Sequence, residues 1–144
     1  TASEACTNPI GQREDGQGFV NAMMGALDIA KVDAKDIKIV KAHCTGTKSN
    51  NMAEKAALES TLHDFVATSY KQKIGHTMGA SGLLETLMMI DDIRNSNTVS
   101  GIANRTSVDS RYLSHDVMAP EGDIMALAAG MGNVYSAAVL SLEI

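Results

Sequence analysis

Helical and strand-like hydrophobic patterns alternate along this chain, and this alternation restricts its possible folds more than any other feature. Apolar side chains at helical spacing predict a helix over residues 18–30, and period-two alternation over residues 36–42 predicts a half-buried strand. Helix-forming residues continue from residue 51 to about residue 63, and residues 65–69 form the next predicted strand. Strands that alternate with helices favour an α/β fold in which helices pack on a sheet.

The second half of the chain predicts one more helix and then two consecutive strands. Residues 78–94 indicate a helix whose apolar side chains cover nearly every face. Strands at residues 123–129 and 134–144 flank the turn Gly130-Met131-Gly132-Asn133 and predict an antiparallel pair. The segments predicted to be irregular are residues 1–15 and 95–122.

The composition is typical of a soluble globular protein and excludes several classes of function. The 144 residues include 12 basic and 17 acidic side chains, which gives a net charge of −5. Only 3% are aromatic and none is tryptophan, which argues against a nucleic-acid binder, because such proteins need basic stripes and stacking faces. No apolar run approaches the roughly 18–20 residues that span a bilayer, so no membrane span is predicted.

The N-terminus and the cysteines indicate the cellular context. The chain starts Thr1-Ala2-Ser3-Glu4, without an initiator methionine or the features of a signal peptide. We therefore expect a cytoplasmic location and a piece cut from a longer protein. Cys6 and Cys44 form no CxxC pair and fit reduced thiols better than a disulfide framework. The length fits a single domain over residues 1–144.

The loop after the first predicted strand contains a histidine followed by two hydroxyl residues. The loop contains His43, Thr45 and Thr47, with the flexible Gly46 between the two threonines. An imidazole and two hydroxyls suit a site that binds a polar ligand through hydrogen bonds. A histidine that only caps the strand-to-helix turn is an equally weighted alternative. A phosphate-binding P-loop is excluded, because Lys41 occupies the position of its first glycine.

A second polar loop leads from the second predicted strand into the apolar helix and contains Lys71 and His76. Two glycines at the start of this helix would let it approach another backbone or a substrate closely. Glu85 lies within the apolar run, and in a helix buried all round its carboxylate must be paired, with Lys71 as the natural partner. The alternative is that Glu85 faces solvent on a narrow stripe together with Asp92.

Three further features receive structural rather than catalytic interpretations. Asn51 and Glu54 have the spacing of a helix capping box. The glycine turn between the last two strands is interpreted as a plain hairpin. A metal site built from His43, Cys44 and His76 is disfavoured because no ligand spacing supports it, so no metal is predicted.

Three motifs occur in the order and at the separations typical of one enzyme family. Residues 42–47 resemble the A-H-G-T-G-T loop of the β-ketoacyl-acyl-carrier-protein synthases, and the segment from Lys71 to Glu85 resembles their second histidine motif. Gly130-Met131-Gly132 falls where these enzymes carry a final G-F-G turn. The resemblance covers almost the whole chain but only the C-terminal half of a ketosynthase. The thiolase-like fold of that family implies a five-stranded mixed sheet covered by helices.

The resemblance also implies an activity, the decarboxylative Claisen condensation of acyl and malonyl thioesters in fatty acid or polyketide synthesis. His43 and His76 would contact the malonyl carbonyl and stabilise the enolate that forms when carbon dioxide leaves. Lys71 would organise the charge of the site, with Glu85 as its fixed counter-ion.

The substrates of the family are carried by an acyl carrier protein on its phosphopantetheine arm, with no further cofactor. Thr45 and Thr47 correspond to the hydroxyls that hold this arm. Met131 stands in place of the phenylalanine that gates the acyl pocket, and Ala129 replaces a second phenylalanine, which would open that pocket.

The nucleophilic cysteine of the family lies in an N-terminal half that is absent here. Cys44 replaces a loop glycine and cannot take its place, so the isolated chain is predicted to be inactive in condensation. The expected partners are the N-terminal half, an acyl carrier protein and a second subunit in a homodimer or heterodimer. The alternative is a non-catalytic, chain-length-factor-like or scaffolding partner of the same fold.

Overall fold

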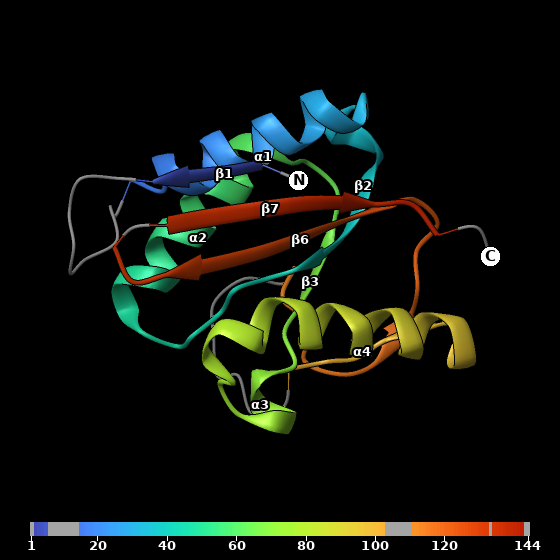
Figure 1. The fold of residues 1–144 in the computed structure, drawn as a ribbon. Helices are drawn as coiled ribbons and strands as arrows, with labels where there is room; N and C mark the ends of the chain where they lie inside the picture. Colours follow the sequence, from blue (N-terminus) through green and yellow to red (C-terminus); the bar gives the residue numbers. More distant parts are fainter. Residues whose placement is uncertain (1, 6–14, 103–110, 133, 143–144) are drawn as a thin grey trace.

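The computed structural model describes residues 2–5, 15–102, 111–132 and 134–142, and a mixed five-stranded sheet lies at its centre (Figure 1). Strand β2 is parallel to β3 and β6, whereas β6 pairs antiparallel with β7, and β7 with β1. The predicted α/β class and the five-stranded mixed sheet are confirmed. In spatial order the strands are β1 (Ala2–Ala5), β7 (Val134–Leu140), β6 (Asp123–Gly130), β2 (Ile37–Lys41) and β3 (Val66–Thr68).

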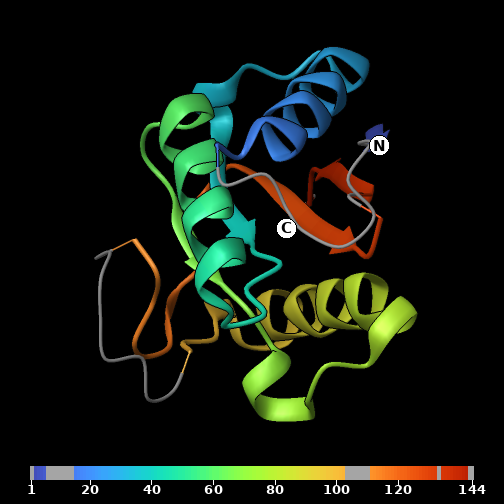
Figure 2. The ribbon, with the colours of Figure 1, turned by 90° about the vertical axis from the view of Figure 1, so that its left-hand side faces the viewer.

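Helices cover both faces of this sheet. Helices α1 (Gln17–Ala30) and α2 (Lys48–Thr61) pack on one face, which we call the α1/α2 face. Helix α4 (Ser81–Ser96) lies on the opposite side of the sheet from α1, on what we call the α4 face (Figures 1 and 2). No helix among the described residues is long and apolar enough to cross a membrane.

Alternation along the strands separates two hydrophobic cores. In β2 and the residues that follow it, Val40, Ala42 and Cys44 join the core beneath α1 and α2, together with Phe19 and Leu58. Ile39 instead joins a second core with Met89 and Ile93 of α4. Because successive strand side chains point to opposite faces, Lys41 and His43 lie on the α4 face.

Several predicted segments differ from the observed structure. Residues 2–5 form β1 rather than irregular chain, because they complete the edge of the sheet beside β7; residues 6–14 lie outside the described residues. The strand predicted to be half-buried is buried on both faces. Within the segment predicted to be irregular, β4 (Thr98–Val99) pairs antiparallel with β5 (Val117–Met118).

The region predicted as one loop and one apolar helix is more finely divided. It contains the short helix α3 (Lys71–Ile74), the 3-10 turn η2 (Met78–Ala80) and then α4, and a further 3-10 turn, η1 (Ala34–Asp36), precedes β2. Helix α4 is not buried all round, since the side chains of Leu83 and Leu87 are 69% and 52% exposed. The predicted close approach occurs at Gly82, where an added Cβ would lie 3.1 Å from the Cβ of Ala128 in β6.

Candidate active site

Two loops that follow the parallel strands β2 and β3 bring their histidines together. The ring centroids of His43 and His76 lie 5.9 Å apart with an interplanar angle of 81°, although 33 residues separate them in sequence (76 − 43). Both rings line a pocket of about 650 Å³. The carboxyl ends of parallel strands meet at one edge of a sheet, which explains this convergence. Two histidines that contact one carbonyl must share a cavity, and His43 and His76 do so.

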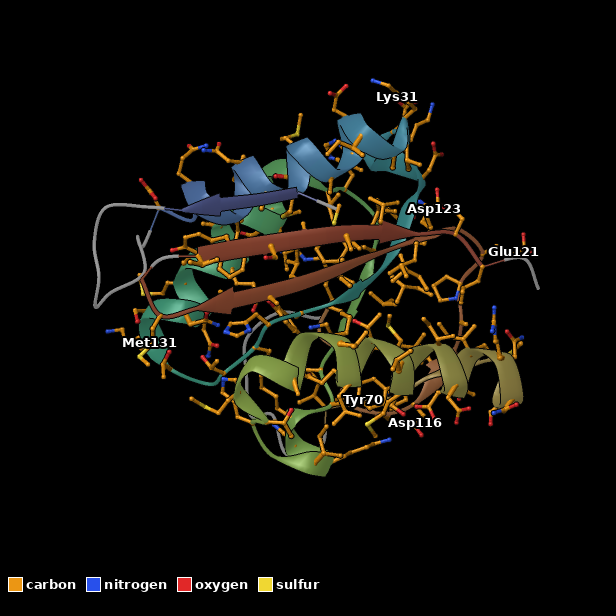
Figure 3. The ribbon with its side chains drawn as sticks, viewed as in Figure 1. Lys31, Tyr70, Asp116, Glu121, Asp123 and Met131 are labelled. Carbon is orange, nitrogen blue, oxygen red and sulfur yellow. The ribbon has the colours of Figure 1, made fainter. Side chains whose placement is uncertain are left out.

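The other walls of this pocket come from three parts of the chain. The hydroxyl residues Thr45, Thr47 and Ser49 lie on one side, and the hydroxyls of Thr45 and Thr47 are 3.3 Å apart. Strands β6 and β7 contribute small side chains, and their connecting turn contributes Met131. Met131, at the turn between β6 and β7 (Figure 3), is 88% exposed and also lines the pocket.

His43 is buried, and the Glu54 carboxylate holds its backbone. The backbone N–H of His43 donates to Oε1 of Glu54 at 2.5 Å, and the backbone N–H of Cys44 donates to Oε2 at 2.9 Å. Burial, followed by the nearby ammonium groups of Lys71 and Lys41, lowers the pKa of His43 to about 3. The imidazole is therefore neutral at physiological pH and can donate a hydrogen bond without carrying a charge.

The position of Glu54 corrects the predicted capping box. Helix α2 begins at Lys48, with Thr47 before it, so Asn51 and Glu54 lie inside the helix rather than at its start. Glu54 is 1% exposed and its carboxylate bridges the two successive N–H groups of the histidine loop. Burial raises the pKa of Glu54, although those two hydrogen bonds act in the opposite direction. Its function is to fix the loop.

The environment of His76 determines which ring nitrogen carries the proton. The backbone N–H of Met78 donates to Nδ1 of His76 at 3.2 Å. A neutral imidazole that accepts at Nδ1 carries its proton on Nε2. The neutral His76 ring therefore presents an Nε2–H donor.

Lys71 and Glu85 form the predicted ion pair, with 2.5 Å between Nζ and Oε1. The two side chains are 8% and 0% exposed, so the alternative of a solvent-facing Glu85 is wrong. Oε1 also accepts from the hydroxyl of Ser81, while Oε2 accepts from the hydroxyl of Ser69 and the N–H of Tyr70. Burial acts to raise the pKa of Glu85, but Lys71 and Ser81 outweigh it and hold that pKa below its ordinary value.

Cys44 lies next to His43 in sequence but points away from the pocket. It adopts a φ of 45°, and its side chain belongs to the apolar core of the α1/α2 face. In the described part of the chain, no group of three histidine, cysteine or acidic residues is arranged to hold a metal ion. Cys6 lies outside the described residues.

Sequence reasoning missed a second buried lysine near the site. Lys41 is fully buried, and its ammonium donates to the carbonyl of Leu127 at 2.5 Å. Burial is the main cause that lowers the pKa of Lys41 to about 8, and the Glu85 and Glu54 carboxylates partly oppose this. The signal was present in the sequence, since Lys41 occupies the same strand face as Ile39 and His43.

Comparison with known proteins identifies relatives by sequence. The model of the family "Beta-ketoacyl synthase, C-terminal domain" matches residues 2–102. The ketoacyl synthase alpha subunit of the tetracenomycin polyketide synthase from Streptomyces glaucescens is 30% identical over 140 residues, which cover 91% of this chain and 33% of that protein. The 3-oxoacyl-[acyl-carrier-protein] synthase 2 of Staphylococcus aureus (strain COL) is 29% identical over 92 residues, 61% of this chain and 22% of that protein.

Solved structures show the same fold. A ketosynthase of a type II polyketide synthase, in complex with its acyl-carrier protein, matches with a TM-score of 0.90 at 20% identity, over 99% of this chain and 37% of that chain. A beta-ketoacyl synthase from Burkholderia phymatum matches with a TM-score of 0.82 at 25% identity, over 96% of this chain and 35% of that chain. The chain spans about a third of the length of the curated relatives that it matches.

Proposed function

This chain belongs to the β-ketoacyl synthase C-terminal domain family, and we propose that it supplies the His43, His76 and Lys71 site of a complete β-ketoacyl-acyl-carrier-protein synthase. In this proposal residues 1–144 are one domain, and a preceding half carries the nucleophilic cysteine. The observation that carries the proposal is the convergence of two imidazoles, 5.9 Å apart, on one pocket. Two donors at this spacing suit a single carbonyl oxygen that gains negative charge.

The proposed reaction begins with the malonyl thioester in the pocket. The bond between the malonyl α-carbon and its carboxylate breaks, carbon dioxide leaves, and the electron pair forms a thioester enolate. The Nε2–H of His76 and the ring N–H of His43 donate to the enolate oxygen and stabilise its charge. The enolate carbon then attacks the acyl thioester, and the cysteine thiolate of the other half leaves as the new carbon–carbon bond forms.

The charges in the site suit a mechanism in which the histidines donate hydrogen bonds and Lys71 supplies positive charge. Because its pKa is lowered to about 3, His43 stabilises the enolate by hydrogen bonding and is not a source of protons that would quench it. Lys71 supplies positive charge beside the histidines, and Glu85 fixes that charge in place. The Thr45 and Thr47 hydroxyls would hold the phosphopantetheine arm, and no further cofactor enters the mechanism.

The exposed side of α4 supports the proposed N-terminal partner half. Leu83, Leu84 and Leu87 are exposed there, and Met78 is exposed at the adjoining turn. Monomeric proteins seldom leave such contiguous apolar surface uncovered. We propose that the N-terminal half covers it, that an acyl carrier protein delivers the substrates, and that the complete enzyme is a homodimer or heterodimer.

A non-catalytic role is the second candidate. Solved structures similar to this chain include the ishigamide ketosynthase/chain length factor, with a TM-score of 0.86 at 22% identity. The pocket-side hairpin carries Ala129 and Met131 where the family resemblance implies phenylalanines, and this departure favours a divergent or scaffolding subunit. The buried Lys71–Glu85 pair and the two histidines favour the enzyme, because a scaffold has no chemical need for them.

The test separates decarboxylation from acyl loading in the complete protein. Release of carbon dioxide from malonyl-acyl carrier protein and acylation of the nucleophile are measured for the parent, His43→Ala and His76→Ala. Both variants should lose decarboxylation by about a hundredfold or more while acyl loading persists, since loading requires no enolate stabilisation. His63→Ala, at an exposed histidine beyond α2, is the matched control and should behave as the parent.

Two outcomes would contradict the proposal. Unimpaired decarboxylation in His76→Ala would remove the mechanism, and a parent protein without any decarboxylation would favour the scaffold. Mass spectrometry of the isolated chain after incubation with acyl-acyl carrier protein completes the test. Stoichiometric acylation of Cys44 would overturn the assignment of the nucleophile to the other half.

A further inference from the structure

Tyr70 attaches the start of α3 to α4 at two points. This residue is 1% exposed and lies immediately before Lys71. Its N–H donates to Oε2 of Glu85 at 3.0 Å, and its hydroxyl donates to Oδ2 of Asp92 at 2.6 Å. Glu85 and Asp92 are seven residues apart, which is about 10.5 Å along a helix that rises 1.5 Å per residue. One residue, through its backbone N–H and its hydroxyl, therefore contacts α4 at two points about two turns apart.

The Asp92 carboxylate connects further segments to the same point. Its Oδ2 also accepts from the hydroxyl of Ser100 at 2.5 Å, and that hydroxyl accepts from Nζ of Lys73 at 2.7 Å. The hydroxyl of Thr68 in β3 donates to the backbone carbonyl of Ser100. A single carboxylate thus connects α4 with α3 and, through Ser100, with the end of β3.

The chemistry of the site assigns no direct role to either residue. The side chains that line the described pocket do not include Tyr70 or Asp92. The tyrosine is nevertheless a permanent donor, because burial, together with Asp92, raises its pKa. A partly buried, charge-assisted hydrogen bond of this kind is short and directional, which suits a positioning function.

The segment that carries Lys71 and His76 needs an external support. Helix α3 has only four residues, too few to be stable alone in water. Gly75 follows it with a φ of 77°, and residues 75, 76, 78, 79 and 80 are exposed. The position of His76 relative to His43 therefore depends on how firmly α3 is attached to α4.

We propose that Tyr70 and Asp92 are positioning residues, whose hydroxyl–carboxylate bond fixes α3 against α4 and so holds Lys71 and His76 in place opposite His43. This inference rests on the proposed function for its catalytic consequence, but not for its structural one. A misplacement of about 1 Å at a reacting centre lowers rates by about a hundredfold, so a loosened α3 should affect the chemical step.

The test compares three variants of the complete protein. Tyr70→Phe removes the hydroxyl and Asp92→Ala removes the acceptor, whereas Asp92→Asn keeps a carbonyl oxygen that can accept from both Tyr70 and Ser100. For decarboxylation of malonyl-acyl carrier protein, kcat should fall about 10- to 100-fold in Tyr70→Phe and Asp92→Ala. The KM should stay within about twofold, because the hydroxyls that hold the arm are untouched. Asp92→Asn should retain most of the parent's kcat.

Amide hydrogen exchange of residues 71–80 provides a readout that does not depend on activity. Exchange should be faster in Tyr70→Phe and Asp92→Ala than in the parent, and close to the parent rate in Asp92→Asn. Faster exchange in the two variants, with no decarboxylation even by the parent, would refute the proposed function and support the positioning of α3. Unchanged kcat and unchanged exchange in Tyr70→Phe would overturn the inference. Equal losses in Asp92→Asn and Asp92→Ala would also overturn it, because an acceptor oxygen at position 92 would then not restore the position of α3.

Discussion

The two faces of the sheet are both buried, but they differ in how many charged side chains they bury. The α1/α2 face holds the larger apolar core, and α2 there also buries the polar residues Asn50, Glu54 and Thr61. On the α4 face, a smaller apolar core lies beside the buried charged and polar side chains of Lys41, His43, Lys71 and Glu85. Buried charges destabilise a fold unless they are paired, so their concentration on one face indicates a function other than stability.

The difference between the two faces arises because successive side chains of β2 and the loop after it point to opposite faces. Lys41 and His43 point to the α4 face, whereas Ala42 and Cys44 point to the α1/α2 face. Glu54 is a charged residue of α2, and it binds the histidine loop. One face therefore stabilises the sheet, and the other uses that rigid sheet to position the site.

The largest expected effect is at the buried ion pair of the α4 face. Glu85→Ala leaves the Lys71 ammonium without its partner and removes the acceptor for Ser69, Tyr70 and Ser81. We expect the free energy of unfolding to fall by about 3–5 kcal/mol, measured by urea unfolding. Glu59→Ala, which removes the carboxylate that pairs with Lys55 and Arg111 near the surface, is the matched control and should cost about 1 kcal/mol or less. Equal effects of the two variants would contradict the account.

The second prediction is that a change in the core of the α1/α2 face lowers stability without lowering activity. Leu58→Ala truncates a side chain that is 1% exposed in the apolar core and should cost about 2–5 kcal/mol. In the complete protein, the rate of decarboxylation per folded molecule should remain within about twofold of the parent rate at temperatures below the melting transition. A loss of decarboxylation as large as that of His76→Ala would show that the two faces do not have separate roles.

The smallest expected effect is a pH-dependent change in the free energy of unfolding, caused by Lys41. The pKa of Lys41 is about 8 in the folded protein, against about 10.4 for an unfolded lysine. Between these values the unfolded chain binds more protons, so the stability contributed by this group rises with pH. Relative to Lys41→Met, the parent should gain about 1 kcal/mol per pH unit from pH 8 to 10, seen as a changing difference in melting temperature. A constant difference would mean that Lys41 is not a buried cation.

The sequence predicts the elements that have a clear hydrophobic period, and it fails where long-range pairing decides. Helix α1 and the β6–β7 pair are predicted within a few residues. Strand β1 was missed because four polar and small residues become a strand only by pairing with β7. The role of Glu54 was missed because its spacing from Asn51 imitates a cap, while its partners are 10 and 11 residues away.

The site was predictable to the extent that its residues lie in motifs. His43, His76, Lys71 and Glu85 were identified, and the structure adds their contacts. Tyr70 and Asp92 were not identified, because neither type of residue in isolation indicates a hydrogen bond across 22 positions. Asp92 entered the sequence analysis only in the alternative of a solvent-facing stripe, whereas in the structure it is partly buried and accepts two hydrogen bonds.

The central claim is that two imidazoles from separate loops donate to one thioester oxygen. The direct measurement is nitrogen-15 NMR of the complete protein, labelled at histidine, with and without an unreactive malonyl thioester analogue. At pH 7 the account predicts a neutral His43, a proton on Nε2 of His76, and N–H signals of both rings that shift together when the analogue binds. A shift in only one ring, or a protonated His43, would contradict the account.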